Sequence, residues 1–433
     1  MFAYYLDLAL RSLKRNKVLT ALMVLALALG IGASMTTLTL LRLLSGNPLP
    51  EKSSQLFYVQ LDPYPKDHPF SRSDKLPWLL TYVDAMNLLH AHRAPRQAAV
   101  AMSRMKLTPT TTQKRPFFSD GVMTTADFFG MFEAPFQYGG GWSAADDETR
   151  AKVVVIAEAL NNRLFGGANS VGRMLRINDQ DFRIIGVLRH WSPQPHFYSL
   201  YLGGRNYGDG DAVFVPLTSA RAAALDPINE FSYGDGNREV LETAPVIWLG
   251  FWAQLPDKSA ASAYASFLTA YAQQQVELGR FQRPRSSLST LMHWLDSQHV
   301  VPDNVRMQTG LAFSFLLICI VNTVGLLLAK CLRRSKEIGV RRALGASRPA
   351  IFAQFMVEAG LIGIAGGAFG LLFAEFGLWC IRRQPAEYAS LAHLNLSMFA
   401  CTFAVALIAS LIAGILPAWR ACVITPAPQL KSA

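Results

Sequence analysis

Four long apolar runs constrain the fold of this chain more than any other feature of its sequence. They are Val18–Leu41, Leu311–Ala329, Ile351–Ile381 and Leu396–Trp419. An α-helix rises about 1.5 Å per residue, so each run is long enough to cross the hydrocarbon core of a bilayer. Helices satisfy their backbone hydrogen bonds within one segment, as lipid requires. The sequence therefore predicts a helical membrane protein with four transmembrane helices.

Basic residues gather at three places beside these runs. The formal net charge of the 433-residue chain is +11, of which residues 1–17 carry +3, residues 330–348 carry +6 and residues 420–433 carry +2. The remaining bases and acids balance, so the excess is a signal of membrane orientation rather than of nucleic-acid binding. It predicts that both termini and the 330–349 loop face the cytoplasm. Arg382 and Arg383, on the predicted outer side, are a mild exception.

The first apolar run admits a second interpretation, a cleaved signal peptide. Gly30–Ser34 supplies small residues of the kind found at cleavage sites. The run is nevertheless longer than a signal-peptide core of about 7–15 residues. We expect it to be retained as the first transmembrane helix.

Residues 46–305 form a large polar segment between the first and second runs. It holds no cysteine, so a domain here must be stable through its own core. Helices are predicted at Ala157–Phe165 and Ser259–Phe281, and a turn at Asn178–Asp181. Strands are predicted at Gln55–Leu61, Val153–Ile156, Arg173–Ile177, Phe182–Leu188, Ala212–Pro216 and Val246–Leu255. The mixed order predicts a large α+β domain on the outer side of the membrane.

The basic segment 330–349 joins the second and third runs and is expected to contain a short helix. Ile338, Arg341 and Arg342 share one helical face at this spacing, and Gly345 is a suitable helix stop. Ser347, with Pro349 two positions later, is suited to cap the next helix.

The residue order in this segment is more specific than its charge. Arg333-Arg-Ser-Lys-Glu-Ile-Gly-Val-Arg-Arg-Ala-Leu-Gly-Ala-Ser347 resembles the cytoplasmic loop of ABC-transporter permeases of the MacB/FtsX family. In that family the loop carries a coupling helix that touches the ATPase subunit. A bare topology signal is the alternative interpretation. The resemblance implies ATPase-coupling roles for Lys336, Glu337, Ile338, Gly339, Arg341, Arg342, Leu344 and Gly345.

Other stretches resemble the same family. The tail Leu416–Pro426 is similar to its C-terminal signature, and parts of the polar segment are similar to its MacB-like periplasmic core domain. The latter are Met123–Phe129, Val153–Leu160, Leu164–Gly166, Gly172–Asn178, Phe182–Leu188 and Val213–Leu217. The resemblance implies three parts: a cytoplasmic N-terminus with helix 1 (1–45), the periplasmic core domain (46–305), and helices 2–4 with the coupling loop 330–349 and a cytoplasmic tail (306–433).

No phosphate-binding Gly-x-x-x-x-Gly-Lys-Ser/Thr loop occurs in the sequence. Macrolide exporters of the family fuse an ATPase to the permease, and this chain departs from that plan. We therefore expect a permease subunit that is not itself an enzyme and needs no cofactor, with ATP bound by a separate ATPase subunit.

The third run contains small and acidic residues at suggestive positions. Gly363, Gly366, Gly367 and Gly370 form two overlapping Gly-x-x-x-Gly patterns, which allow close helix contact either within the chain or in a moving or dimeric interface. Glu358 lies only about 10 Å past the start of the run, where it is expected to approach the cytoplasmic interface. Glu358-Ala359 resembles a Glu-Ala pair of the family, and this resemblance implies a structural or coupling role rather than proton relay.

Other candidate sites are weaker. The histidines do not cluster as metal ligands, and no nucleophile elbow or zinc-helix motif occurs, so neither a metal site nor a catalytic residue is expected. The aromatic loop that includes Trp191, Phe197, Tyr198 and Tyr201 is either a structured loop or, if exposed, a contact surface for cargo or a periplasmic partner.

These observations predict a multi-pass permease of the bacterial inner membrane, coupling ATP hydrolysis by a dimeric ATPase to movement of its periplasmic domain for export. A second permease, identical or similar, is expected, and a periplasmic adaptor with an outer-membrane channel would fit an efflux pump. The alternatives are an FtsX-like regulator of a cell-wall hydrolase, a lipoprotein-extraction permease, and a membrane-anchored binding module without an ATPase. The sequence does not discriminate among cargoes.

Overall fold

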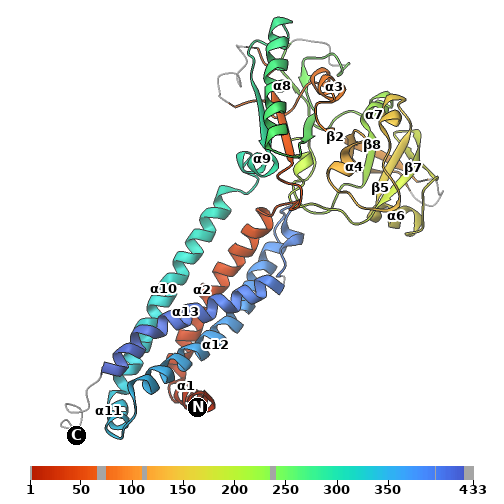
Figure 1. The fold of residues 1–433 in the computed structure, drawn as a ribbon. Coiled ribbons are helices and arrows are strands. Elements are labelled where there is room, and N and C mark those ends of the chain that lie inside the picture. Colours follow the sequence, from red (N-terminus) through yellow and green to blue (C-terminus); the bar gives the residue numbers. More distant parts are fainter. Residues whose placement is uncertain (1, 66–74, 110–114, 235–239, 395, 424–433) are drawn as a thin grey trace. The chain divides into compact units, whose positions relative to one another are not determined.

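The computed structural model describes residues 2–65, 75–109, 115–234, 240–394 and 396–423 (Figure 1). The chain divides into two compact units, residues 46–300 and residues 1–45 together with 301–433. The first of these contains the sheets and the second is helical.

The helical unit contains the four predicted transmembrane helices. Each is longer than its apolar run: α2 spans Lys17–Leu44, α10 Asp303–Arg333, α12 Arg348–Arg382 and α13 Leu396–Val423. All four are long and apolar enough to cross a membrane, which confirms the prediction of four spans. The helix α1 (Phe2–Arg15) precedes α2, the helix α11 (Ser335–Ala343) joins α10 to α12, and a 3-10 turn at Ala389–Leu391 precedes α13.

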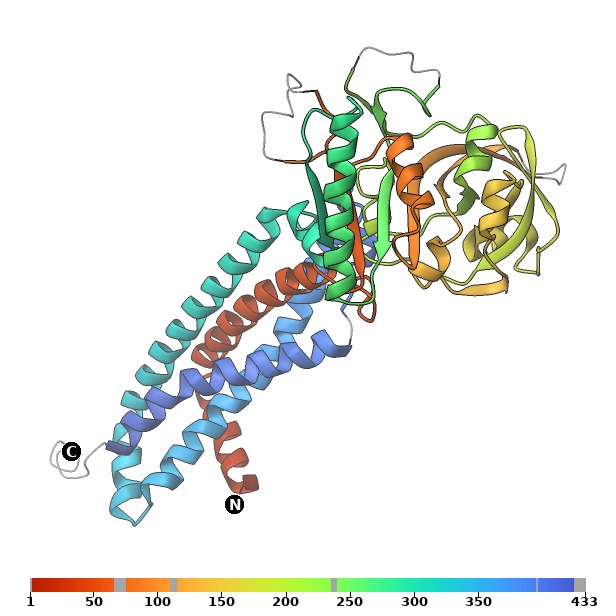
Figure 2. The ribbon, with the colours of Figure 1, turned by 45° about the horizontal axis from the view of Figure 1, so that its top comes forward.

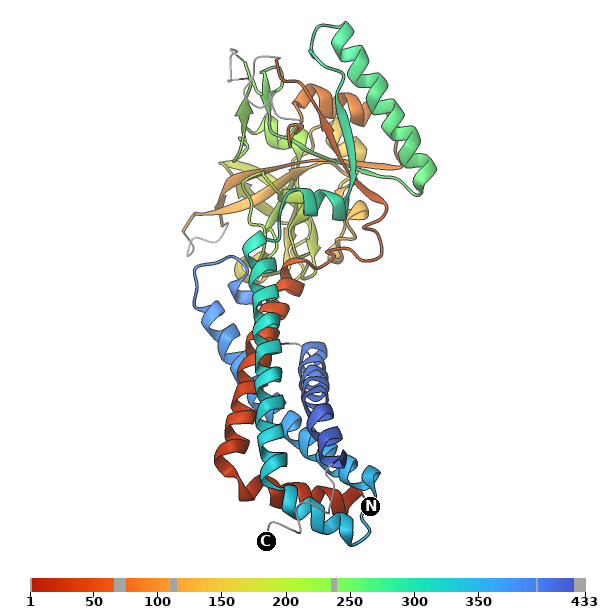
Figure 3. The ribbon, with the colours of Figure 1, turned by 90° about the vertical axis from the view of Figure 1, so that its left-hand side faces the viewer.

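Helix α12 is central to this unit because it packs on both α2 and α13. Figure 3 shows α10 (teal) alongside α2 (red). The shared apolar core includes Met23, Ile31, Leu316, Ile362 and Ala406, one or more from each transmembrane helix.

The other unit is an α+β domain built on one ten-stranded sheet of mixed direction. The strand order is β12-β1-β11-β2-β3-β8-β5-β7-β4, and β6 pairs with both β2 and β7. The strands are β1 Leu56–Leu61, β2 Arg96–Thr108, β3 Phe117–Thr124, β4 Phe136–Gly139, β5 Val153–Ala157, β6 Met174–Ile177, β7 Gln180–Leu188, β8 Val213–Pro216, β11 Gly250–Gln254 and β12 Ser286–Thr290. A separate two-stranded sheet pairs β9 (Phe231–Ser232) with β10 (Val246–Ile247).

Short helices cover this sheet, and the long α8 (Lys258–Glu277) packs against β12 (Figure 2). The others are α3 Tyr82–His90, α4 Phe128–Met131, α5 Ala144–Glu148, α6 Glu158–Phe165, α7 Leu217–Ala222, α9 Leu291–Ser297 and a 3-10 turn at Phe197–Ser199. The predicted helices correspond to α6 and α8. The predicted strand Val246–Leu255 is in fact two strands of different sheets, because β10 pairs with β9 whereas β11 pairs with β1 and β2.

The predicted turn between β6 and β7 is confirmed. Asn178 and Asp179 both have positive φ, 44° and 63°, the conformation that a tight hairpin requires. The Asn178 side chain also accepts a hydrogen bond from the Lys106 backbone N–H at 2.8 Å, which attaches the hairpin to β2.

Strand β2 lies between two cores. Its residues alternate between them, with Ala99 and Ala101 in one and Ala98 and Val100 in the other. Both faces of the strand are therefore buried, which requires a nearly continuous apolar sequence rather than alternation of apolar and polar residues.

Asp147 joins three segments of this domain. Its carboxylate accepts the Ala126 N–H at 2.7 Å, and its backbone carbonyl accepts the Thr218 hydroxyl at 2.6 Å. Burial raises the pKa of Asp147 to about 7, whereas the unfolded chain would ionise near 3.8. Between these pH values the unfolded state has released a proton that the folded state retains, so this residue favours unfolding increasingly as pH rises.

We expect Asp147→Asn to stabilise the protein relative to wild type by about 1–3 kcal/mol more at pH 8 than at pH 5. Asparagine keeps an acceptor for the Ala126 N–H and carries no charge. Thermal unfolding of the full chain, followed by tryptophan fluorescence at both pH values, measures this. Asp146→Asn is the matched control. Hydrogen bonds from Ser143 lower the pKa of Asp146 below 3.8, so the effect of this substitution on stability should be the same at pH 5 and pH 8. An equal stability difference between Asp147→Asn and wild type at both pH values would contradict the prediction.

Candidate coupling site

The predicted end of the helix in the basic segment, and the predicted start of the next helix, are confirmed. Helix α11 ends at Ala343, and Gly345 has a φ of +96°, the left-handed conformation that suits a glycine helix stop. The N–H groups of Gly345 and Ala346 return to the carbonyls of Arg342 and Arg341 at 3.1 and 3.0 Å. Ser347 then caps α12 by accepting the Ala350 N–H at 3.4 Å, with Pro349 near the helix start.

One face of α11 is fixed within the chain. Ile338 and Gly339 are buried, and Ile338 belongs to a small core with Ile351, Phe355 and Ala418 from α12 and α13. Arg342 donates to the Cys422 carbonyl at 3.2 Å. These contacts attach α11 to both helices, so Ile338 and Arg342 help to hold α11 in place. Their predicted role toward an ATPase stays a prediction.

Glu337 lies at the side of α11, surrounded by arginines. Its carboxylate is 2.8 Å from Arg341, 3.8 Å from Arg334 and 3.7 Å from Arg15 of α1. Arg341 also donates to Gln354 at 3.1 Å. Glu337 and Arg341 thus have intrachain partners, yet the side chain of each is still 36% exposed. Their contact with an ATPase stays a prediction.

The opposite face of α11 is exposed and largely apolar. Leu344, just past the helix, is 83% exposed and Val340 is 48% exposed. Lys336 and Ala343 are exposed on the same face, at positions i, i+4, i+7 and i+8 with the other two. We call Lys336, Val340, Ala343 and Leu344 the α11 outer face. Val340 and Ala343 were not among the residues predicted to couple to an ATPase, although their helical spacing from Lys336 and Leu344 could have indicated them.

Glu358 is buried inside the helical unit, with 1% of its surface exposed. Its expected closeness to the cytoplasmic interface stays a prediction. Glu358 accepts a hydrogen bond from Ser12 of α1 at 2.8 Å and pairs with Lys330 of α10, itself 1% exposed. Arg334, between α10 and α11, lies 3.8 Å from Glu358 and donates to Ser12 at 2.6 Å. Four helices therefore meet at this carboxylate or its immediate partners.

The four glycines of α12 face two different helices of the same chain. A Cβ at Gly363 or Gly367 would meet Ser410 or Ala406 of α13, whereas one at Gly366 or Gly370 would meet Leu27 or Ile31 of α2. Of the two interpretations left open, the structure shows close packing within the chain.

The C-terminal end of α12 accounts for part of the predicted exception to the charge rule. Arg382 is 2.6 Å from Glu375 and also donates to the Ala392 carbonyl at 2.6 Å. A nearby acid thus compensates the charge of Arg382.

The aromatic loop is mainly part of the domain core. Phe197 and Tyr198 are each 1% exposed, and Trp191 stacks on Tyr198 with ring centroids 5.3 Å apart. Tyr201 stacks on Trp78 at 4.2 Å. The interpretation of Phe197 and Tyr198 as an exposed contact surface is therefore wrong, because composition does not distinguish an aromatic core from an aromatic surface.

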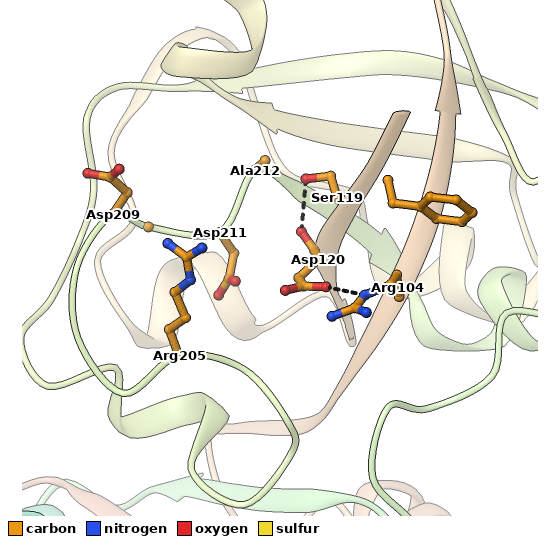
Figure 4. Close-up of a pocket in the computed structure, with 9 residues that line it drawn as sticks. Arg104, Ser119, Asp120, Arg205, Asp209, Asp211 and Ala212 are labelled. Carbon is orange, nitrogen blue, oxygen red and sulfur yellow. Dashed lines mark hydrogen bonds and ion pairs between the residues drawn. The ribbon is translucent and has the colours of Figure 1, made fainter. Parts of the chain in front are cut away.

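Figure 4 shows a polar cavity of about 440 Å³ between β3 and the segment that leads into β8. Arg104 pairs with Asp120 at 3.1 Å in its wall, and Arg205 and Asp209 add charges of both signs. Burial raises the pKa of Asp211 to about 6, and the Tyr198 hydroxyl donates to it at 2.8 Å. Among the described residues, no group of three histidines, cysteines or acids is placed to hold a metal ion.

Comparison with family models matches most of the chain. Residues 20–271 match the MacB-like periplasmic core domain, and residues 309–426 match the FtsX-like permease C-terminal domain. The match agrees with the resemblance found in the sequence.

Similar curated proteins are larger. The pyoverdine export ATP-binding/permease protein PvdT of Pseudomonas aeruginosa is 25% identical over 310 residues, covering 71% of this chain and 41% of PvdT. The macrolide export ATP-binding/permease protein MacB of Bdellovibrio bacteriovorus is 27% identical over 246 residues, covering 54% of this chain and 32% of MacB. The chain thus spans about two fifths or less of these relatives' lengths.

Among solved structures, the periplasmic region of MacB from Actinobacillus actinomycetemcomitans aligns with a TM-score of 0.38 and 12% identity. The alignment covers 60% of this chain and 98% of that structure.

Proposed function

This chain belongs to the ABC-transporter permeases that combine a MacB-like periplasmic core domain with an FtsX-like permease domain, and on that premise we propose that it is a permease subunit driven by a separate ATPase. The ATPase would bind the α11 outer face, and its closure on ATP would move α11. The transmembrane helices would pass that motion to the 46–300 domain for export. One observation carries the proposal: an exposed apolar helix face in a chain that has no phosphate-binding loop of its own.

The chemistry of the α11 outer face supports protein contact. An apolar centre at Val340 and Leu344, with the charge of Lys336 at its edge, has the composition of a small protein interface. The opposite face of α11 is packed against α12 and α13. A displacement of α11 would therefore also displace both of these helices.

The names of the similar proteins favour export as the function of the transporter. PvdT and MacB carry export in their names, and this chain shares both family domains with the permease group. The working unit would contain two permeases and two ATPase subunits, and a periplasmic adaptor with an outer-membrane channel would complete an efflux route. Regulation of a cell-wall hydrolase and extraction of lipoproteins are the alternative outputs, which the identity of co-purified proteins would discriminate.

We expect the purified chain alone to hydrolyse no ATP, because it lacks a phosphate-binding loop. An ABC ATPase should co-purify with it in mild detergent, and the complex should hydrolyse ATP. Phosphate release before and after stringent removal of the partner measures both. Turnover that persists in the stripped chain would refute the proposal.

The proposed topology places α11 and both termini in the cytoplasm and the 46–300 domain in the periplasm of a cell with an inner membrane. Single cysteines at positions 120, 205 and 340, in a chain whose five native cysteines are replaced, test it in intact cells. A membrane-impermeant maleimide should label positions 120 and 205 and spare 340. Labelling of 340, or protection of 120 and 205, would overturn this topology.

A further inference from the structure

The side chains around Glu358 form a continuous series of alternating charge, which we call the ionic series. It runs from Lys330 to Glu358, then Arg334, Glu337 and finally Arg341. Arg334 lies 3.8 Å from each of the two carboxylates and so is shared between them. The series begins on α10 and α12 and ends on α11.

The burial of the side chains decreases steadily along this ionic series. The side chains of Lys330 and Glu358 are 1% exposed, that of Arg334 is 14% exposed, and those of Glu337 and Arg341 are each 36% exposed. Electrostatic attraction is strongest where water is excluded, so the tightest link is the Lys330–Glu358 pair between two transmembrane helices. Ser12 adds α1 to the same carboxylate.

We propose that Glu358 is a positioning residue: it fixes α11 in one orientation relative to α10, α12 and α1, so that these segments move together. Its importance for transport rests on the proposed function, but the fixing of α11 does not. The core contact of Ile338 is apolar and non-directional, and the hydrogen bonds of Arg341 and Arg342 reach only α12 and α13. The ionic series has a defined geometry and adds α10 and α1.

A purely stabilising role accounts poorly for this arrangement. Replacing a buried ion pair with apolar side chains of similar volume is often neutral or stabilising, because removing charges from water is costly. Buried polar groups can instead select one arrangement among several apolar packings. Glu358 fits this role because a single carboxylate contacts side chains from α1, α10 and the start of α11.

Hydrogen exchange of the purified full chain in lipid nanodiscs tests the proposal without an ATPase. We expect Glu358→Gln to raise the exchange rate of the α11 amides, residues 335–343, by about tenfold or more through local opening. Glu375→Gln is the matched control, because it removes an ion-paired acid from the same helix at its other end and should leave α11 unchanged.

The double variant Lys330→Met, Glu358→Met separates positioning from stability. It removes both buried charges, so the overall thermal stability should recover toward wild type. The α11 amides should still exchange about tenfold faster, because Ser12 and Arg334 lose the Glu358 carboxylate that links them to α12. Wild-type exchange of α11 in a folded Glu358→Gln protein, or in the double variant, would overturn the proposal. Failure of the chain to bind an ATPase would refute only the proposed function.

Discussion

A protein carrying Gly363→Val is expected to lose about 3 kcal/mol of stability or more through overpacking, and to separate α12 from α13. A Cβ at position 363 would lie 2.7 Å from the Cβ of Ser410, closer than real Cβ contacts, and closer still to the Ser410 hydroxyl. Rotating the Ser410 side chain cannot relieve the first clash, so the helix backbones must move apart. Thermal unfolding of the detergent-solubilised protein, followed by tryptophan fluorescence, measures the loss.

Gly360→Val on the same helix is the matched control. A Cβ there would meet nothing within 4 Å, so the substitution changes helix propensity without a clash. The two variants should therefore differ strongly in unfolding temperature. Equal unfolding temperatures would mean that the α12–α13 contact is not tightly packed.

The double substitution Val340→Glu, Leu344→Glu is expected to reduce permease-stimulated ATP turnover by about tenfold to a hundredfold. It places two carboxylates in the centre of the α11 outer face, where burial against a partner would leave them unpaired. Both side chains are exposed in the chain alone, so α11 should remain folded. Turnover of the reconstituted permease–ATPase complex measures the effect, and unchanged turnover would argue against this face as the contact.

The sequence predicted the transmembrane helices well because length and hydropathy determine them almost alone. The end of α11 and the start of α12 were also predictable, since Gly345 and Ser347 act locally. Strands β2 and β3 were missed. Seven consecutive residues of β2 are buried, so the alternation that identifies a half-exposed strand is absent from its centre.

The interior of the candidate site could not be predicted in the same way. Ser12 and Glu358 are 346 positions apart in the sequence, and only the tertiary fold brings them together. Glu337 shows the same limit. Helical spacing predicts that it lies near Arg341, but it does not predict the approach of Glu337 to Arg15 of another helix. The prediction of an exposed aromatic loop failed for a related reason, because Phe197 and Tyr198 are buried by segments distant in sequence.

Recovery of the partner ATPase tests the central claim most directly. The tagged wild-type chain, Leu344→Glu and the control Leu278→Glu would be purified in mild detergent at matched expression, and the bound ABC ATPase quantified by mass spectrometry. Leu278 is a suitable control because it is also an exposed leucine, 64% exposed, but lies at the end of α8. If α11 is the docking site, Leu344→Glu should recover about tenfold less ATPase, and Leu278→Glu as much as wild type. Equal recovery with all three proteins would show that the α11 outer face does not bind the ATPase.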